Sequence, residues 1–186
     1  MSKKKDKQDE ITEVIIEEPL GDDDIKKYLP DARVMKYSAL KNIKSIEELL
    51  PNEIDYVVLL YEDSPNKGHW VTVLRYGDTI EFFDSYGGEP DKPLSWNDEY
   101  TNENLNQEPY LSNLFNKTDK RVIYSPTKFQ GGGNDINTCG RHTVFRILNL
   151  IEKDRPLGEY YEIMKEIKRL TKSSYDDIVA NLINVI

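Results

Sequence analysis

The spacing of hydrophobic and polar positions changes along this chain, and each change predicts a different kind of element. Within 21–51, two short segments each begin with acidic or polar residues and end with apolar ones. This pattern predicts two small helices that stop before Pro30 and Pro51. The continuous apolar run IDYVVLLYE at 54–62 is typical of a strand buried on both faces. From Thr138 onward the apolar residues recur at helical spacing, which predicts three C-terminal helices.

A β-hairpin is predicted directly after the buried strand. The segments HWVTVLRY and TIEFFDSY flank the pair Gly77-Asp78, which suits a two-residue turn. Tyr76 then faces Thr79, and because side chains alternate between the two faces of a strand, the register of the whole hairpin follows.

The same register predicts that a histidine lies beside an aspartate. His69 and Asp84 fall on one face as diagonal neighbours, with Cα atoms roughly 7–8 Å apart. An imidazole N–H can reach a carboxylate at that distance. The face continues with Val71, Val73, Ile80 and Phe82, and we expect it to pack on the apolar stripe Val144, Ile147, Leu148 and Ile151.

The remaining segments complete an α+β pattern. A further short strand is predicted at 121–126, and the polar stretch 87–118 is expected to run over the surface. Residues 1–20 are rich in Lys, Asp and Glu and are expected to form a flexible arm. Residues 21–186 are long enough for one domain with its own core.

Charge and cysteine content limit the possible functions. The chain has 34 acidic and 25 basic residues, and a net charge of −9 argues against general nucleic-acid binding. The single cysteine excludes an internal disulfide and a zinc site built on several cysteines, so no cofactor or metal is expected. With no signal peptide and no long apolar run, the sequence predicts a soluble protein that works in a reducing compartment.

That single cysteine, Cys139, stands at the predicted start of a helix in NDINTCGRH. It is either a small buried side chain or a nucleophile, because a helix N-terminus and an imidazolium both favour the reactive thiolate. His69, oriented by Asp84, is the better partner if the helix packs on the hairpin. His142 competes because it follows Cys139 by three residues on the same helical face, but the sequence offers it no evident carboxylate.

Acyl transfer through a nucleophilic cysteine also needs donors for the oxyanion that forms. The backbone N–H of Cys139 is one candidate. The side-chain amide of Gln130 in FQGGGNDINTCG is another, although Gln130 and the glycines after it can equally be loop residues.

The four segments GHWVTVL, EFFDSYG, KFQGG and NTCGRHTVFRIL together resemble the adenain family and the related ubiquitin-like-protein-specific cysteine proteases. The resemblance covers roughly 54–153, and it is greatest for the small maturation proteases of virophages and Polinton-type viruses. It implies a papain-like fold of the adenain type, with a mostly antiparallel sheet packed against helices and the cysteine at a helix N-terminus.

Carried over residue by residue, the resemblance implies Cys139 as nucleophile, His69 as base, Asp84 as its orienter and Gln130 as oxyanion donor. Substrate would lie against Trp70, Gly131 and Gly132. Two departures stand out. The Gly131–Gly133 run lengthens the interval from Gln130 to Cys139, so Asn134 or Asn137 are alternative donors, and Thr138 replaces the Asp that SUMO proteases often carry.

The resemblance further implies a cysteine endopeptidase that cuts viral capsid or core precursors during virion maturation, next to small residues such as glycine. It would act as a monomer in the virion and in the host cytoplasm, on protein substrates and without a membrane partner. The alternatives are a protease for ubiquitin-like modifiers, in the manner of a deubiquitinase or deSUMOylase, and an inactive protease fold that serves as a capsid scaffold.

Overall fold

A computed structural model describes residues 11–133 and 135–184 of the chain. It divides into two compact units: Asp31–Lys128 forms one, and Met1–Pro30 together with Phe129–Ile186 forms the other. Each unit is described by itself below.

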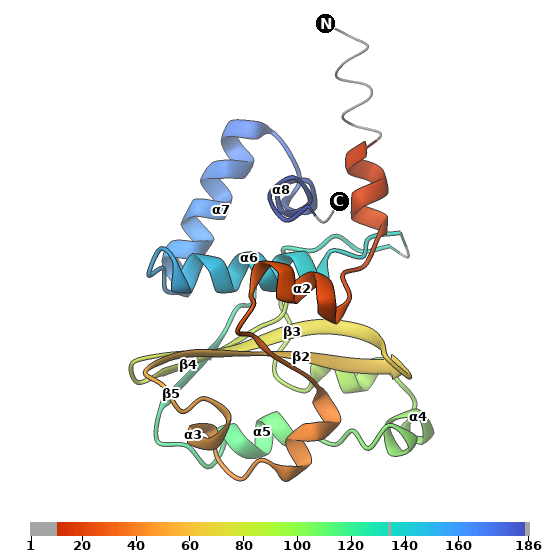
Figure 1. The fold of residues 1–186 in the computed structure, drawn as a ribbon, viewed down its shortest axis with the longest axis vertical. Coiled ribbons are helices and arrows are strands. Elements are labelled where there is room, and N and C mark those ends of the chain that lie inside the picture. Colours follow the sequence, from red (N-terminus) through yellow and green to blue (C-terminus); the bar gives the residue numbers. More distant parts are fainter. Residues whose placement is uncertain (1–10, 134, 185–186) are drawn as a thin grey trace, which may run out of the picture. The chain divides into compact units, whose positions relative to one another are not determined.

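The unit Asp31–Lys128 is built on a five-stranded sheet (Figure 1). Its strands are β1 (Arg33–Lys36), β2 (Ile54–Ser64), β3 (Lys67–Tyr76), β4 (Thr79–Phe83) and β5 (Arg121–Tyr124), in the spatial order β1-β2-β3-β4-β5. The two central pairs are antiparallel, as predicted, whereas both edge strands pair in parallel with their neighbours. The sheet is therefore mixed, because helical crossovers return the chain in the same direction before β2 and before β5.

The structure confirms the predicted hairpin and its register. Tyr76 pairs with Thr79, and Gly77 takes the positive φ of 57° that a tight turn needs. Strand β2 is buried on both faces over 57–61, as its continuous apolar run predicts.

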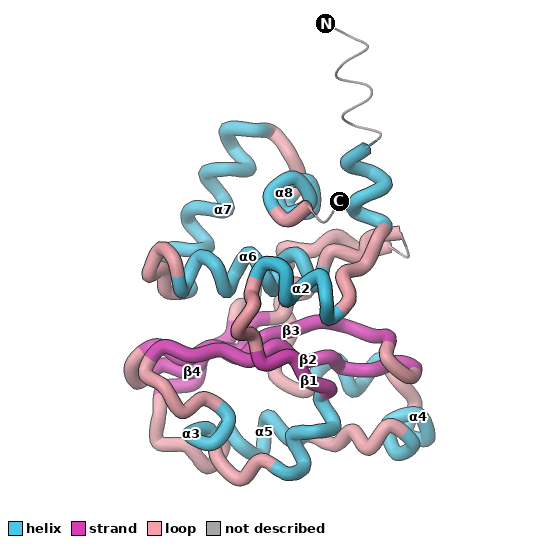
Figure 2. Tube along the Cα trace, viewed as in Figure 1, coloured by secondary structure: helices cyan, strands magenta, loops and turns pink. Residues whose placement is uncertain are grey.

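Short helices connect the strands of this unit (Figure 2). They are η1 (Tyr37–Asn42), α3 (Ile46–Leu49), η2 (Lys92–Trp96), α4 (Glu99–Asn104) and α5 (Tyr110–Phe115). Helix α3 is capped by Ser45, whose hydroxyl accepts the N–H of Glu48 at 3.2 Å. The Glu48 carboxylate accepts the N–H of Lys44 rather than that of Ser45.

Two expectations about this unit are wrong. The sheet face that carries Val71 and Phe82 packs on helices of its own unit, not on the stripe of the helix after Thr138. It forms one core with η1, α3 and α5, to which α5 contributes Leu111, Leu114 and Phe115. The stretch 87–118 is therefore more than a surface excursion, because these α5 side chains are part of the core and Leu94 packs against it.

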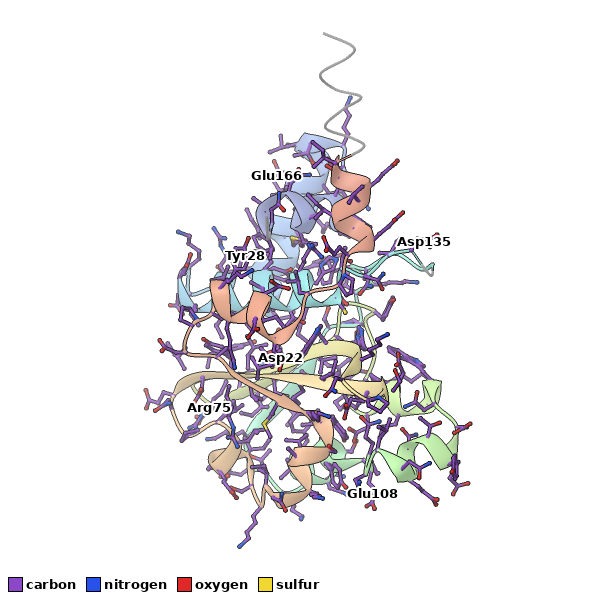
Figure 3. All side chains as sticks on the ribbon, turned by 45° about the vertical axis from the view of Figure 1, so that its right-hand side comes forward. Asp22, Tyr28, Arg75, Glu108, Asp135 and Glu166 are labelled. Carbon is purple, nitrogen blue, oxygen red and sulfur yellow. The ribbon has the colours of Figure 1, made fainter. Side chains whose placement is uncertain are left out.

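The second unit is helical in the part that the structure describes. It contains α2 (Asp22–Tyr28), which corresponds to the small helix predicted before Pro30. It also contains α6 (Cys139–Ile151), α7 (Leu157–Thr171) and α8 (Tyr175–Leu182), as the C-terminal periodicity predicts. Helices α2 and α8 both contact α6, and the labelled Tyr28 of α2 (Figure 3) donates its hydroxyl to the carbonyl of Asn184.

Helix α6 is buried on more than its predicted stripe. Val144 and Ile147 are buried, but Ile151 is 41% exposed. Arg141, His142 and Arg146 are buried instead. Polar side chains in a core need partners, so their burial marks α6 as the helix around which the other elements of this unit make hydrogen bonds.

Residues 11–17 are helical in the structure, and Thr12 and Ile15 within them are buried. The boundary of the predicted arm at residue 20 stays a prediction. Among the described residues, no helix has the length and apolar character needed to cross a lipid bilayer.

Candidate active site

The imidazole of His69 is hydrogen-bonded to the carboxylate of Asp84. Nε2 of His69, on β3, lies 2.8 Å from Oδ1 of Asp84, which directly follows β4, and both side chains are buried. The same Oδ1 accepts the backbone N–H of Tyr86 at 2.8 Å. The juxtaposition that the hairpin register predicts is confirmed.

This hydrogen bond determines which ring nitrogen of His69 can act as a base. A carboxylate on Nε2 favours the tautomer that carries its proton there, so the lone pair of the neutral ring is on Nδ1. The charge of Asp84 also stabilises the imidazolium that forms when Nδ1 takes a proton. The pair is therefore suited to general-base chemistry through Nδ1.

Two aromatic rings that the sequence did not single out lie against His69. Tyr86 stacks on the imidazole with ring centroids 5.0 Å apart, and Trp96 of η2 meets it edge-on at 5.1 Å. Trp70 is buried and, as the next residue on β3, lies on the opposite face of the sheet from His69. A substrate-binding role for Trp70 stays a prediction.

Cys139 is the first residue of α6 and is 7% exposed. The positive end of the helix dipole favours negative charge at this position. Arg141 lies two residues further on, itself buried, and donates to the carbonyl of Glu18 at 2.5 Å. Burial lowers the pKa of Arg141, while negative charges that include that of Cys139 raise it.

Gln130 is buried in the same unit as Cys139, where its side chain holds the loop that leads to Cys139. Its Nε2 donates to the carbonyl of Ile136 at 3.0 Å, which closes the glycine-rich turn. Its oxyanion role stays a prediction. Of the two alternative donors, Asn134 lies outside the described residues, and Asn137 donates its side-chain amide to the carbonyl of Glu17 at 2.7 Å.

The N-terminal segment bonds to residues beside Cys139. The backbone N–H of Asn137 donates to the carbonyl of Ile16 at 2.8 Å, in addition to the bonds that Asn137 and Arg141 make to Glu17 and Glu18. Residues 16–18 thus bond to residues on both sides of Cys139. The sequence gives no sign of this contact, because it joins positions about 120 apart.

Asp176 of α8 is the main functional candidate that sequence reasoning missed. Its Oδ1 lies 3.1 Å from Nε2 of His142 and accepts the Thr138 hydroxyl at 2.5 Å. His142 therefore does have an orienting carboxylate, contrary to the sequence expectation. The only sequence signal is an acidic pair, Asp176-Asp177, in the first turn of a predicted helix, which normally indicates capping.

The predicted site residues fall into two groups. The sheet unit holds His69, Asp84 and Trp70, and brings the first two together. The helical unit holds Cys139 and Gln130 with Gly131 and Gly132; Gly131 donates its N–H to Asp176, and Gly132 is exposed. The pairing of Cys139 with His69 joins the two groups and stays a prediction. Among the described residues, no three His, Cys, Asp or Glu side chains are grouped to hold a metal ion.

Comparison with known proteins gives a relative from a virophage. The uncharacterized protein V9 of Sputnik virophage is 39% identical over 150 residues, which are 80% of this chain and 83% of V9. No protein-family model matches the chain.

Among solved structures, the ASFV pS273R protease is similar with a TM-score of 0.40 and 16% identity, over 70% of this chain and 57% of that protease. The SUMO protease Ulp1 has a TM-score of 0.39 and 16% identity, over 93% of this chain and 76% of Ulp1. The central domain of Lpg1148 from Legionella pneumophila has a TM-score of 0.40 and 18% identity, over 90% and 99% of the two chains.

Proposed function

The chain belongs to the family of protein V9 of Sputnik virophage, and we propose that it is a cysteine endopeptidase that processes viral structural proteins. The observation that carries the proposal is the buried hydrogen bond from His69 to Asp84. It gives an imidazole oriented for base chemistry, in a chain whose single cysteine begins a helix.

The proposed reaction uses Cys139 as the nucleophile and Nδ1 of His69 as the base. His69 takes the thiol proton, and the thiolate attacks the carbonyl carbon of the scissile peptide bond. The new C–S bond places negative charge on the carbonyl oxygen, which the N–H of Cys139 and the amide of Gln130 would stabilise. When the C–N bond breaks, the His69 imidazolium gives its proton to the leaving amine. Water then hydrolyses the thioester and regenerates the thiol.

His69 is a better base for this reaction than His142. The base must also reach the leaving amine of a bound substrate, and His142 is fully buried with its Nε2 on Asp176. His69 is buried less completely and keeps 7% of its surface exposed. We therefore propose His142 as part of the scaffold around Cys139.

Because the relative V9 belongs to a virophage, we propose capsid or core precursors as substrates, cleaved next to small residues such as glycine. The test is a cleavage assay with purified full-length protein on virophage capsid-precursor protein and on peptides of the form Gly-Gly-Xaa. Cys139→Ala serves as the inactive variant, and peptides with bulky residues in place of the glycines serve as the matched substrates.

We expect wild type to cut the precursor and the Gly-Gly-Xaa peptides, and Cys139→Ala to cut neither. Faster release from a ubiquitin-like C-terminal fluorogenic substrate than from the precursor would instead assign a deconjugating protease. Normal particle maturation with Cys139→Ala would contradict a protease and favour a capsid scaffold. Equal rates on glycine and bulky peptides would remove the small-residue preference.

A further inference from the structure

One carboxylate, that of Asp176, bonds to Gly131 and Thr138, which precede Cys139, and to His142, which follows it. Its Oδ2 accepts the backbone N–H of Gly131 at 2.8 Å, and its Oδ1 accepts the Thr138 hydroxyl at 2.5 Å. Gly131 directly follows Gln130, and Thr138 directly precedes Cys139. Asp176 is only 5% exposed, so these bonds are shielded from water.

We infer that Asp176 is a positioning residue of the proposed protease, which fixes the spacing between the Gln130 loop and the first turn of α6. The inference rests on the proposed function, in which Gln130 and the N–H of Cys139 stabilise the same oxyanion. Two donors from separate segments act together only if their separation is held, and Asp176 ties the two segments to α8.

The bond between Asp176 and Thr138 also changes how the N-terminus of α6 is capped. A threonine at the N-cap usually accepts the N–H of the second or third helical residue. Thr138 makes no such side-chain bond, and its hydroxyl donates to Asp176 instead. The side chain just before Cys139 is thus held by α8 rather than by the first turn of α6.

The charge of Asp176 is balanced within the same cluster. Burial raises the pKa of Asp176, but hydrogen bonds from His142 and Thr138 and the attraction of His142 outweigh it, so the pKa lies below 3.8. Asp176 is therefore an anion at neutral pH and accepts all three hydrogen bonds. His142, when protonated, offsets a negative charge that would otherwise oppose a thiolate at Cys139.

Gly131 suits this arrangement because a side chain at this position would crowd both neighbours of the backbone. A Cβ at this position would lie 2.9 Å from Cδ1 of Ile136 and 3.1 Å from Oδ2 of Asp176. The backbone of Gly131 approaches the carboxylate closely only without a side chain. The first glycine of the predicted Gly-rich loop thus has a packing reason that does not involve substrate.

The test compares Asp176→Asn with Asp177→Asn in the full-length protein. Asp177 is the neighbouring carboxylate on α8, and it accepts the N–H and hydroxyl of Ser174 in a capping box. These bonds tie it to Ser174 at the start of α8, so it controls for loss of α8 stability. Steady-state cleavage gives kcat and KM, and iodoacetamide gives the alkylation rate of Cys139 at pH 7.

We expect Asp176→Asn to lower kcat roughly 10²-fold, the size of effect that a small misplacement of reacting groups produces, with KM changed less than about 2-fold. Alkylation of Cys139 should slow as well. Asp177→Asn should keep both rates within about 2-fold of wild type. In a second pair, Thr138→Val should lose activity and Thr138→Ser, which keeps the hydroxyl, should recover most of it.

The inference is overturned if Asp176→Asn matches Asp177→Asn in kcat and alkylation, or if Thr138→Val is as active as Thr138→Ser. The Thr138 pair decides the matter if Asp176→Asn does not fold. If Cys139 of wild type is inert and no substrate is cut, the proposed function itself fails and the inference falls with it. A reactive wild-type Cys139 that Asp176→Asn leaves unchanged removes the inference alone.

Discussion

Nε2 of His69 lies 2.8 Å from Oδ1 of Asp84, in a hairpin whose turn is only two residues long. The short turn matters because it leaves one register, and that register places both side chains on the same face. The pair is consequently preorganised by local structure alone.

Replacing Asp84 by Asn should abolish most of the activity with little loss of folding. The amide keeps the shape of the carboxylate but removes the charge that holds the proton on Nε2 and stabilises the imidazolium. We expect kcat/KM to fall by about 10²–10⁴, the usual contribution of general acid–base catalysis. Asp78→Asn, a fully exposed carboxylate at the turn of the same hairpin, is the matched control and should change nothing. An Asp84→Asn enzyme as active as this control would remove Asp84 from the site.

Gly88→Ala should damage the same pair through packing. A Cβ at position 88 would lie 2.9 Å from Oδ2 of Asp84, and the backbone φ there needs no glycine. Displacing this carboxylate should lower kcat/KM roughly 5- to 160-fold if an overpacking cost of about 1–3 kcal/mol falls on the transition state. Gly158→Ala is the control because its Cβ meets no atom within 4 Å. Equal activity of the two variants would show that the site accommodates the methyl group.

Trp96→Ala should weaken catalysis although Trp96 lies outside every sequence motif. Its ring is 49% exposed and contacts the imidazole of His69 edge-on. Aromatic pairs of this kind contribute about 0.5–1.5 kcal/mol, so we expect kcat/KM to fall roughly 2- to 12-fold. Trp96→Phe should retain most of the activity, and thermal unfolding should show that both variants are nearly as stable as wild type. An unchanged kcat/KM in Trp96→Ala would mean that the contact is incidental.

The hairpin, β2 and the C-terminal helices could be predicted from the sequence because turn residues and periodicity are local signals. The His69–Asp84 contact follows from the same local register. Asp176 could not be predicted, since its bonds to Gly131 and Thr138 join positions about 40 residues apart. The element that packs on the Val71 face of the sheet could not be predicted either, for the same reason. A few apolar residues of α5, which lie within a polar stretch, complete the core there.

The pKa of Asp176 predicts a pH dependence of folding. Its folded pKa lies below the ordinary 3.8, so the unfolded chain binds the proton more readily. The resulting stability is present above about pH 4 and is lost as the pH falls through the folded pKa. Urea unfolding at pH 7 and at pH 3 should therefore show that wild type and Asp176→Asn differ less in free energy of unfolding at pH 3. A difference that stays constant would contradict an ionised, hydrogen-bonded Asp176.

The central claim is that Cys139 and His69 act as a pair, and alkylation of the single cysteine tests it most directly. The rate with iodoacetamide is measured from about pH 4 to 9 in wild type and in His69→Ala, with His142→Ala as the competing variant. We predict a wild-type rate that stays high well below the free-thiol pKa of about 8.5 and collapses in His69→Ala. A wild-type rate that rises only near pH 8.5, or one that His69→Ala leaves unchanged, would contradict the pair.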